Sequence, residues 1–130
     1  MSQAHLEVVR RMLDARDRDD LPAAFAYLDP DVEFIPLRAA TEGTYNGHEG
    51  VQKFLTDTSE NFESFQPRYE LAELGDRVLA WGTILVRGRG SGVEMEIPSG
   101  GIFDFRAGKI TRWQDFGSKE KALEAAGMPE

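Results

Sequence analysis

Residues 100–116 read GGIFDFRAGKITRWQDF, and the pattern of this stretch decides the fold. Residues 102–106 and 110–116 each mix β-branched, aromatic and charged side chains at a spacing near two, which is typical of strands with one buried face. Gly108 supplies the positive φ that a short hairpin loop between them needs. The stretch therefore predicts two antiparallel strands, the second of which carries a carboxylate, Asp115, near its end.

Asp115 is the residue that points most clearly to chemistry. It follows Trp113 by two residues, so both side chains lie on the same face of the predicted strand. The flanking aromatic residues indicate the wall of a pocket, and apolar surroundings disfavour the charged form of a carboxyl group. We therefore expect the pKa of Asp115 to lie above its ordinary value, which makes it a usable general acid or base near neutral pH. The alternative interpretation is a solvated acid on the surface of the sheet.

The composition limits the kinds of protein this chain can be. Its 130 residues include no cysteine and carry a formal net charge of -8. The length predicts one domain over residues 1–130 with a single sizeable core. Without cysteine there are no disulfides, thiolate nucleophiles or cysteine metal sites, and two histidines far apart in the sequence do not form a zinc-binding pattern. We expect neither a metal nor a cofactor.

Charge and hydropathy also bear on the partners of the chain. The negative charge would repel the phosphate backbone of a nucleic acid, and the basic residues alternate with acids or glycines instead of forming a tract. No apolar run approaches the roughly 20 residues of a membrane span, and the first residues lack the apolar core of a signal peptide. We therefore expect a cytoplasmic protein that binds neither nucleic acid nor a membrane.

Apolar residues at helical spacing predict three helices ahead of the strands. The first covers about residues 4–18, and a short second one begins near Leu21. A short strand at residues 32–37 then precedes the third and longest helix, which follows Gly50. One face of this third helix carries Val51, Phe54, Leu55, Thr58 and Phe62.

The spacing of apolar residues changes to two from Gln66 onward. The strands that it predicts cover residues 68–74, 77–87, 93–105 and 109–116, joined as an antiparallel meander. Ser118 is placed to cap a last short helix. Together the elements predict an α+β fold, in which a cone-like, curved antiparallel sheet wraps around the long third helix and leaves a concave interior.

Two motifs extend this prediction to a known family. Residues 43–51 read GTYNGHEGV and residues 108–113 read GKITRW. With the order of the elements, these motifs resemble the SnoaL-like branch of the nuclear transport factor 2-like superfamily, to which ketosteroid isomerase also belongs. The resemblance covers nearly the whole chain and implies a cystatin-like α+β roll, an apolar pocket, and a homodimer packed through the sheet.

Within that branch, residues 101–103 and 108–116 look most like limonene epoxide hydrolase, a family in which the acid after the tryptophan helps to activate the hydrolytic water. Asp115 matches that acid. The Arg-x-Asp pair of the same family falls at Gly82 and Ile84 of this chain. Polyketide cyclases of the SnoaL kind use an acid near the end of the last strand, and Asp115 is compatible with that role as well.

Two further residues are catalytic candidates beside Asp115. His48 lies at the predicted start of the third helix, where it is either an acid/base group or a structural part of the turn. Glu33 either points inward and forms a carboxylate pair with Asp115, which would raise one pKa, or points to solvent. As pocket-lining, substrate-binding residues we expect Trp113, Phe34, Tyr45, Trp81, Ile84 and Phe54.

These residues predict an enzyme of hydrolase, isomerase or cyclase type that acts without a cofactor on a small lipophilic or polyketide-like molecule, with Asp115 as its acid or base. Two alternatives stay open. One is a non-catalytic domain that binds a hydrophobic ligand. The other is a protein-interaction domain that uses the surface of its sheet.

Overall fold

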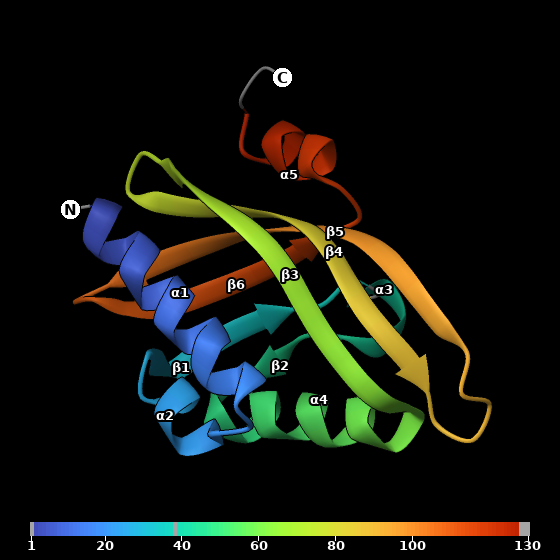
Figure 1. The fold of residues 1–130 in the computed structure, drawn as a ribbon. Helices are drawn as coiled ribbons and strands as arrows, with labels where there is room; N and C mark the ends of the chain where they lie inside the picture. Colours follow the sequence, from blue (N-terminus) through green and yellow to red (C-terminus); the bar gives the residue numbers. More distant parts are fainter. Residues whose placement is uncertain (1, 38, 128–130) are drawn as a thin grey trace.

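The computed structural model describes residues 2–37 and 39–127, which form a curved sheet with helices on both faces (Figure 1). The helices are α1 (Ser2–Asp17), α2 (Leu21–Phe25), α3 (Ala39–Glu42), α4 (Gly47–Asn61) and α5 (Lys119–Ala125), and the strands are β1 (Leu28–Ile35), β2 (Tyr45–Asn46), β3 (Phe62–Leu74), β4 (Arg77–Gly88), β5 (Glu94–Arg106) and β6 (Lys109–Phe116). This arrangement confirms the predicted α+β class. Among the described residues, every helix is too short or too polar to span a bilayer.

The strands form one sheet in the order β2-β1-β6-β5-β4-β3. Strands β3, β4 and β5 each pair antiparallel with the next strand along the chain, which confirms the predicted meander. Strand β1, however, pairs with β6 in parallel, so the sheet is mixed and the prediction of a wholly antiparallel sheet is wrong for this pair of strands. No hairpin joins β1 to β6, because they lie far apart in the sequence, and turn chemistry therefore does not set their relative direction.

The hairpin between β5 and β6 has the predicted two-residue turn. Ala107 and Gly108 both have a positive φ, of 52° and 80°, which is the combination found in a type I′ turn. The turn pairs Arg106 with Lys109, and after a shift in register between Phe105 and Asp104 the hairpin pairs Phe103 with Trp113 and Gly101 with Asp115. As the sequence predicts, Trp113 and Asp115 are two residues apart on one strand and lie on the same face of it.

Some local predictions differ from the structure. Strand β1 begins at Leu28 instead of residue 32, and neither α3 nor β2 is foreseen by the apolar spacing. Phe62, expected on the long helix, has an extended backbone (φ -127°, ψ 132°) and begins β3. Strand β3 pairs with β4 along its length, and these interstrand hydrogen bonds outweigh a helical periodicity that is only a local signal.

The main core lies between the inner face of the sheet and the helices α1 and α4. Val9 and Met12 of α1 are buried there against Phe34, Phe103 and Trp113 of the sheet. The ring centroid of Trp113 lies 4.8 Å from that of Phe34 and 5.1 Å from that of Phe103. The burial of such large apolar side chains fixes the position of β6 and of the residues that follow Trp113.

A smaller core lies on the outer face of the sheet, under α5. It consists of Leu79, Ile102 and Ala122, and Trp81 packs against it. The Nζ atom of Lys119 lies 4.2 Å from the ring centroid of Trp81. The expectation that Trp81 lines the pocket is therefore wrong, because alternation along β4 turns this side chain to the outer face. The homodimer implied by the resemblance involves a second copy of the chain and stays a prediction.

Candidate functional site

A wide cavity of about 560 Å³ lies beside α4 on the inner face of the sheet. We call it the wide cavity, and its size suits a ligand of about two or three fused rings. Its lining includes Tyr45, Phe54, Ile84, Ile97, Ser99 and Asp115. Ser99 and Asp115 line the part of this cavity that lies next to the core. We call this part the inner end of the wide cavity.

Asp115 is the carboxylate of the inner end. The indole Nε1–H of Trp113 donates a hydrogen bond of 3.0 Å to its Oδ1 atom. Burial raises the pKa of Asp115 to about 7, although the positive charge of Arg16 and the hydrogen bond from Trp113 act in the opposite direction. Near neutral pH both protonation states of Asp115 are therefore populated, as a general acid or base requires.

A pair of hydroxyl groups lies beside this carboxyl group. The oxygen atoms of Tyr69 and Ser99 are 3.0 Å apart and share a hydrogen bond. Burial and the negative charge of Asp115 raise the pKa of Tyr69 to about 12, whereas its hydrogen bond to Ser99 and the charge of Arg16 lower it. Tyr69 therefore keeps its proton at neutral pH, and the pair offers an O–H donor at the inner end.

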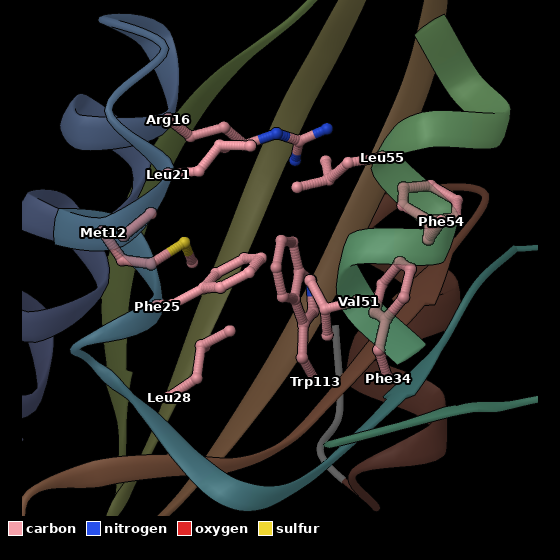
Figure 2. A pocket seen from close by; sticks show the side chains of 11 residues that line it. Met12, Arg16, Leu21, Phe25, Leu28, Phe34, Val51, Phe54, Leu55 and Trp113 are labelled. Atoms are coloured by element: carbon pink, nitrogen blue, oxygen red, sulfur yellow. The ribbon is translucent and has the colours of Figure 1, made fainter. Parts of the chain in front are cut away.

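Arg16 of α1 brings a positive charge close to these groups. Its guanidinium carbon lies 5.3 Å from the ring centroid of Phe65. Figure 2 shows the side chain pointing from α1 toward Leu55 of α4, above Trp113, where it lines a small second cavity of about 20 Å³. That volume holds about one water molecule. Burial lowers the pKa of Arg16, and the charges of Asp115, Tyr69 and Asp17 oppose this shift.

The structure brings several of the expected pocket residues together. Tyr45, Phe54 and Ile84 line the wide cavity with Asp115. Phe34 and Trp113 line the small cavity instead, and Phe54 borders both. The aromatic and apolar walls foreseen in the sequence thus surround two adjoining spaces.

The two other catalytic candidates lie away from Asp115. The Nε2 atom of His48 is 3.0 Å from the backbone oxygen of Leu28, and its ring packs near that of Phe25. Glu33 accepts a hydrogen bond of 3.2 Å from Arg112. Alternation along β1 turns Glu33 to the outer face, so the carboxylate pair with Asp115 does not form.

Sequence reasoning missed Arg16, Tyr69 and Ser99. A signal exists for Arg16, which follows the buried Met12 by four residues and so falls on the apolar stripe of its helix. Tyr69 and Ser99 meet only because both face Gly82 across β4, and that register is not visible in the sequence. Among residues 2–37 and 39–127, no three histidine or carboxylate side chains gather closely enough to hold a metal ion.

We expect the substitution Trp113→Phe to raise the pKa of Asp115 above 7. The indole N–H stabilises the charged carboxylate by donating to it, and phenylalanine removes that donor while it keeps an aromatic ring in the core. The measurement is a pH titration of the carboxyl carbon by NMR, assigned by comparison with Asp115→Asn. The matched control is Trp81→Phe on the outer face, which should leave the titration of Asp115 unchanged. Equal titration midpoints in the native protein, Trp113→Phe and Trp81→Phe would contradict the role of Trp113.

We also expect Asp115→Asn to stabilise the fold at pH 8 relative to the native protein. The pKa of Asp115 rises from 3.8 to about 7 on folding, so the folded state holds a proton that the unfolded state has lost. Stability is therefore highest at low pH and falls as the pH rises from about 4 to 7. At about 1.4 kcal/mol per pKa unit, the loss is at most about 4 kcal/mol. Urea unfolding at pH 4.5 and 8 measures it; a difference between the two proteins that does not change with pH would contradict the expected burial.

Comparison with protein families gives a match to the SnoaL-like domain over residues 9–113. The matched part begins in α1 and ends within β6, so it includes most of the elements that surround the wide cavity. A search of curated proteins gives no match.

Solved structures share the fold. An NTF2-like protein of unknown function from Burkholderia pseudomallei K96243 is 23% identical, with 93% of this chain and 95% of that chain covered and a TM-score of 0.80. A protein from Xanthomonas campestris pv. campestris, provisionally named a polyketide cyclase, is 23% identical, with 92% and 94% covered and a TM-score of 0.79. TerC, co-crystallised with polyporic acid, is 23% identical, with 93% and 98% covered and a TM-score of 0.79.

Proposed function

The chain belongs to the family of SnoaL-like domains, and we propose that it is a cofactor-free enzyme that moves a proton on a small, mainly apolar, carbonyl-containing substrate. The observation that carries this proposal is a carboxyl group with a pKa of about 7, that of Asp115, in the lining of a wide cavity. A carboxyl group with an ordinary pKa is a weaker base, and at neutral pH almost none of it is protonated. It therefore accepts and donates protons less well than Asp115.

In the proposed step, the carboxylate of Asp115 accepts a proton from a carbon atom next to a carbonyl group. The C–H bond breaks, and its electron pair forms an enolate whose oxygen carries the charge. The O–H group of the Tyr69–Ser99 pair that is not used in their mutual hydrogen bond is available to donate to that oxygen. Return of the proton from Asp115 to another atom of the substrate gives an isomer. Alternatively, the enolate carbon attacks a second carbonyl group and closes a ring, the C=O π bond opens to an alkoxide, and the proton held by Asp115 passes to that alkoxide.

A polyketide-like substrate fits this chemistry, because polyketides carry carbonyl groups with acidic C–H bonds between them. The provisional name of the Xanthomonas protein supports a polyketide, and the co-crystallisation of TerC with polyporic acid supports a small carbonyl-containing organic ligand for this fold. Isomerase or cyclase chemistry is favoured over epoxide hydrolysis. The Arg-x-Asp pair that the hydrolase resemblance calls for is replaced by Gly82 and Ile84, neither of which offers a polar side chain to orient a water molecule.

A non-catalytic ligand-binding domain is the second candidate. It is favoured by the isolation of Asp115 from the other two catalytic candidates, since His48 contacts the backbone of Leu28 and Glu33 pairs with Arg112. In this reading the raised pKa of Asp115 is a consequence of burial without a role in turnover.

Proton exchange separates the two candidates without knowledge of the natural substrate. The protein is mixed with 1-tetralone or 2-tetralone in D₂O, and NMR follows deuterium entering the carbon next to the carbonyl group. An enzyme of the proposed kind accelerates this exchange over buffer. If the ketones raise the melting temperature, as ligands of the cavity should, but exchange at the buffer rate, the proposal fails and the binding domain is the better description.

A further inference from the structure

Arg16 has an unusual environment for an arginine. A guanidinium carries five N–H donors and no acceptor, yet within residues 2–37 and 39–127 the partner that the structure gives this side chain is the ring of Phe65. Arginines on the outer face of the sheet are paired instead: Arg77 lies 2.7 Å from Asp104. Among the described residues no buried side-chain nitrogen lacks a partner, so the guanidinium donors of Arg16 reach solvent or a cavity, where a group from outside the chain can accept their hydrogen bonds.

Arg16 lines one of the two cavities and contacts a residue that lines the other. It lines the small cavity, and Phe65, over whose ring it lies, lines the wide cavity. It is also close enough to Asp115 for their charges to interact, although among the described ion pairs of 4.0 Å or less the two are not joined. An oxygen atom of a ligand can bridge two groups that are too far apart to contact each other directly.

We propose that the inner end of the wide cavity is a subsite for an anionic oxygen of the ligand, with Arg16 as its counter-charge. This inference rests on the proposed function and names the substrate class more closely: a largely apolar ring system that carries one acidic group, such as a carboxylate. The apolar body of the ligand lies along Phe54, Ile84 and Ile97, which line the same cavity.

Carboxylates at the outer part of the wide cavity repel an anion, but this repulsion is weaker than the attraction by Arg16. They are Glu42, Asp57 and Glu60. Asp57 is paired with Lys53 at 2.9 Å, and Glu42 accepts a hydrogen bond of 3.0 Å from Tyr45. Water and salt screen such groups where they meet solvent, whereas the charge of Arg16 acts in a less polar interior, where charges interact more strongly. The acidic group of the ligand therefore points inward.

Asp115 gives the subsite a pH dependence. An ionised Asp115 repels an anion at the inner end, and a protonated one does not. The other groups that face Asp115 are the cation of Arg16 from α1, the neutral hydroxyl of Tyr69 from β3 and, on its own strand, the indole of Trp113. A carboxylate ligand, with a pKa near 4, stays anionic, so its affinity should rise as the pH falls from 8 to 6.

The test compares three ligands of one shape: 2-naphthoate, which is anionic, 2-naphthamide, which is neutral, and 2-naphthylmethylamine, which is cationic. Dissociation constants are measured by calorimetry at pH 6 and 8 for the native protein, Arg16→Met, Arg16→Lys and the control Arg18→Met. Arg18 is exposed just after α1. The substitution Arg18→Met removes the same positive charge as Arg16→Met, but from the surface. We expect the native protein to bind naphthoate about tenfold more tightly than the amide, a difference of about 1.4 kcal/mol.

That preference should vanish in Arg16→Met, persist in Arg16→Lys and Arg18→Met, and be larger at pH 6 than at pH 8. Equal binding of naphthoate and amide by the native protein overturns the inference while the proposed function stands, and this result does not depend on any variant folding. Tightest binding of the amine also overturns the inference, because the outer carboxylates would then determine which charge the cavity prefers. If none of the three binds, the ligand-binding cavity itself is refuted, and the proposed function fails together with the subsite.

Discussion

The substitution Asp115→Asn is expected to slow the exchange of tetralone protons by about 10²- to 10⁴-fold, to the rate seen in buffer. Asparagine has nearly the size of aspartate and can still accept the hydrogen bond from Trp113, but it cannot take up a proton. Ligand-induced changes in melting temperature should therefore persist for the neutral ketones. Loss of exchange together with retained binding separates the loss of a base from the loss of the site.

The pH profile sharpens this expectation. If the carboxylate form of Asp115 is the base, the exchange rate of the native protein rises with pH and levels off above about 7, the pKa of the group. The profile of Asp115→Asn should lack this step. Glu96→Gln, which removes an exposed carboxylate on β5, serves as the control and should keep the native profile. A native rate that survives in Asp115→Asn would show that another group carries out the transfer.

The substitution Gly82→Ala is expected to have the largest effect on stability, a loss of about 3 kcal/mol or more or a failure to fold. Gly82 has a φ of 154°, which side-chain-bearing residues rarely adopt. A Cβ atom there would overlap the backbone oxygen of Arg68 on the neighbouring strand. Because Gly82 pairs with both Tyr69 and Ser99, relief of this overlap would move the strands that hold the two hydroxyl groups.

Gly75→Ala is the matched control. Gly75 also has a positive φ, of 64°, but no atom lies within 4 Å of the place its Cβ would take. This substitution should therefore cost only about 1 kcal/mol, the strain of the backbone conformation alone. Urea unfolding of both variants measures the difference. A loss for Gly82→Ala no larger than that for Gly75→Ala would mean that the backbone at Gly82 adjusts without disturbing β3.

The sequence by itself determined the elements whose signals are local. The turn at Gly108, the cap at Ser118 and the alternation through Trp113 and Asp115 each depend on a few neighbouring residues, and the structure has a type I′ turn at Gly108 and a Ser118 side chain that accepts a hydrogen bond from the backbone of Lys121. Alternation alone also places the side chain of Asp115 on the same face of the strand as that of Trp113. Together these signals predicted the hairpin, the meander and the α+β class.

Only the tertiary structure decided which side chains surround Asp115. Arg16, Tyr69 and Ser99 come from a helix and two strands, and they approach Asp115 because strand register and helix packing bring these elements together. The same packing placed β1 parallel to β6 and turned Glu33 and Trp81 to the outer face of the sheet. Register and helix packing depend on contacts between residues far apart in the chain, which a local pattern of apolar and polar residues does not encode.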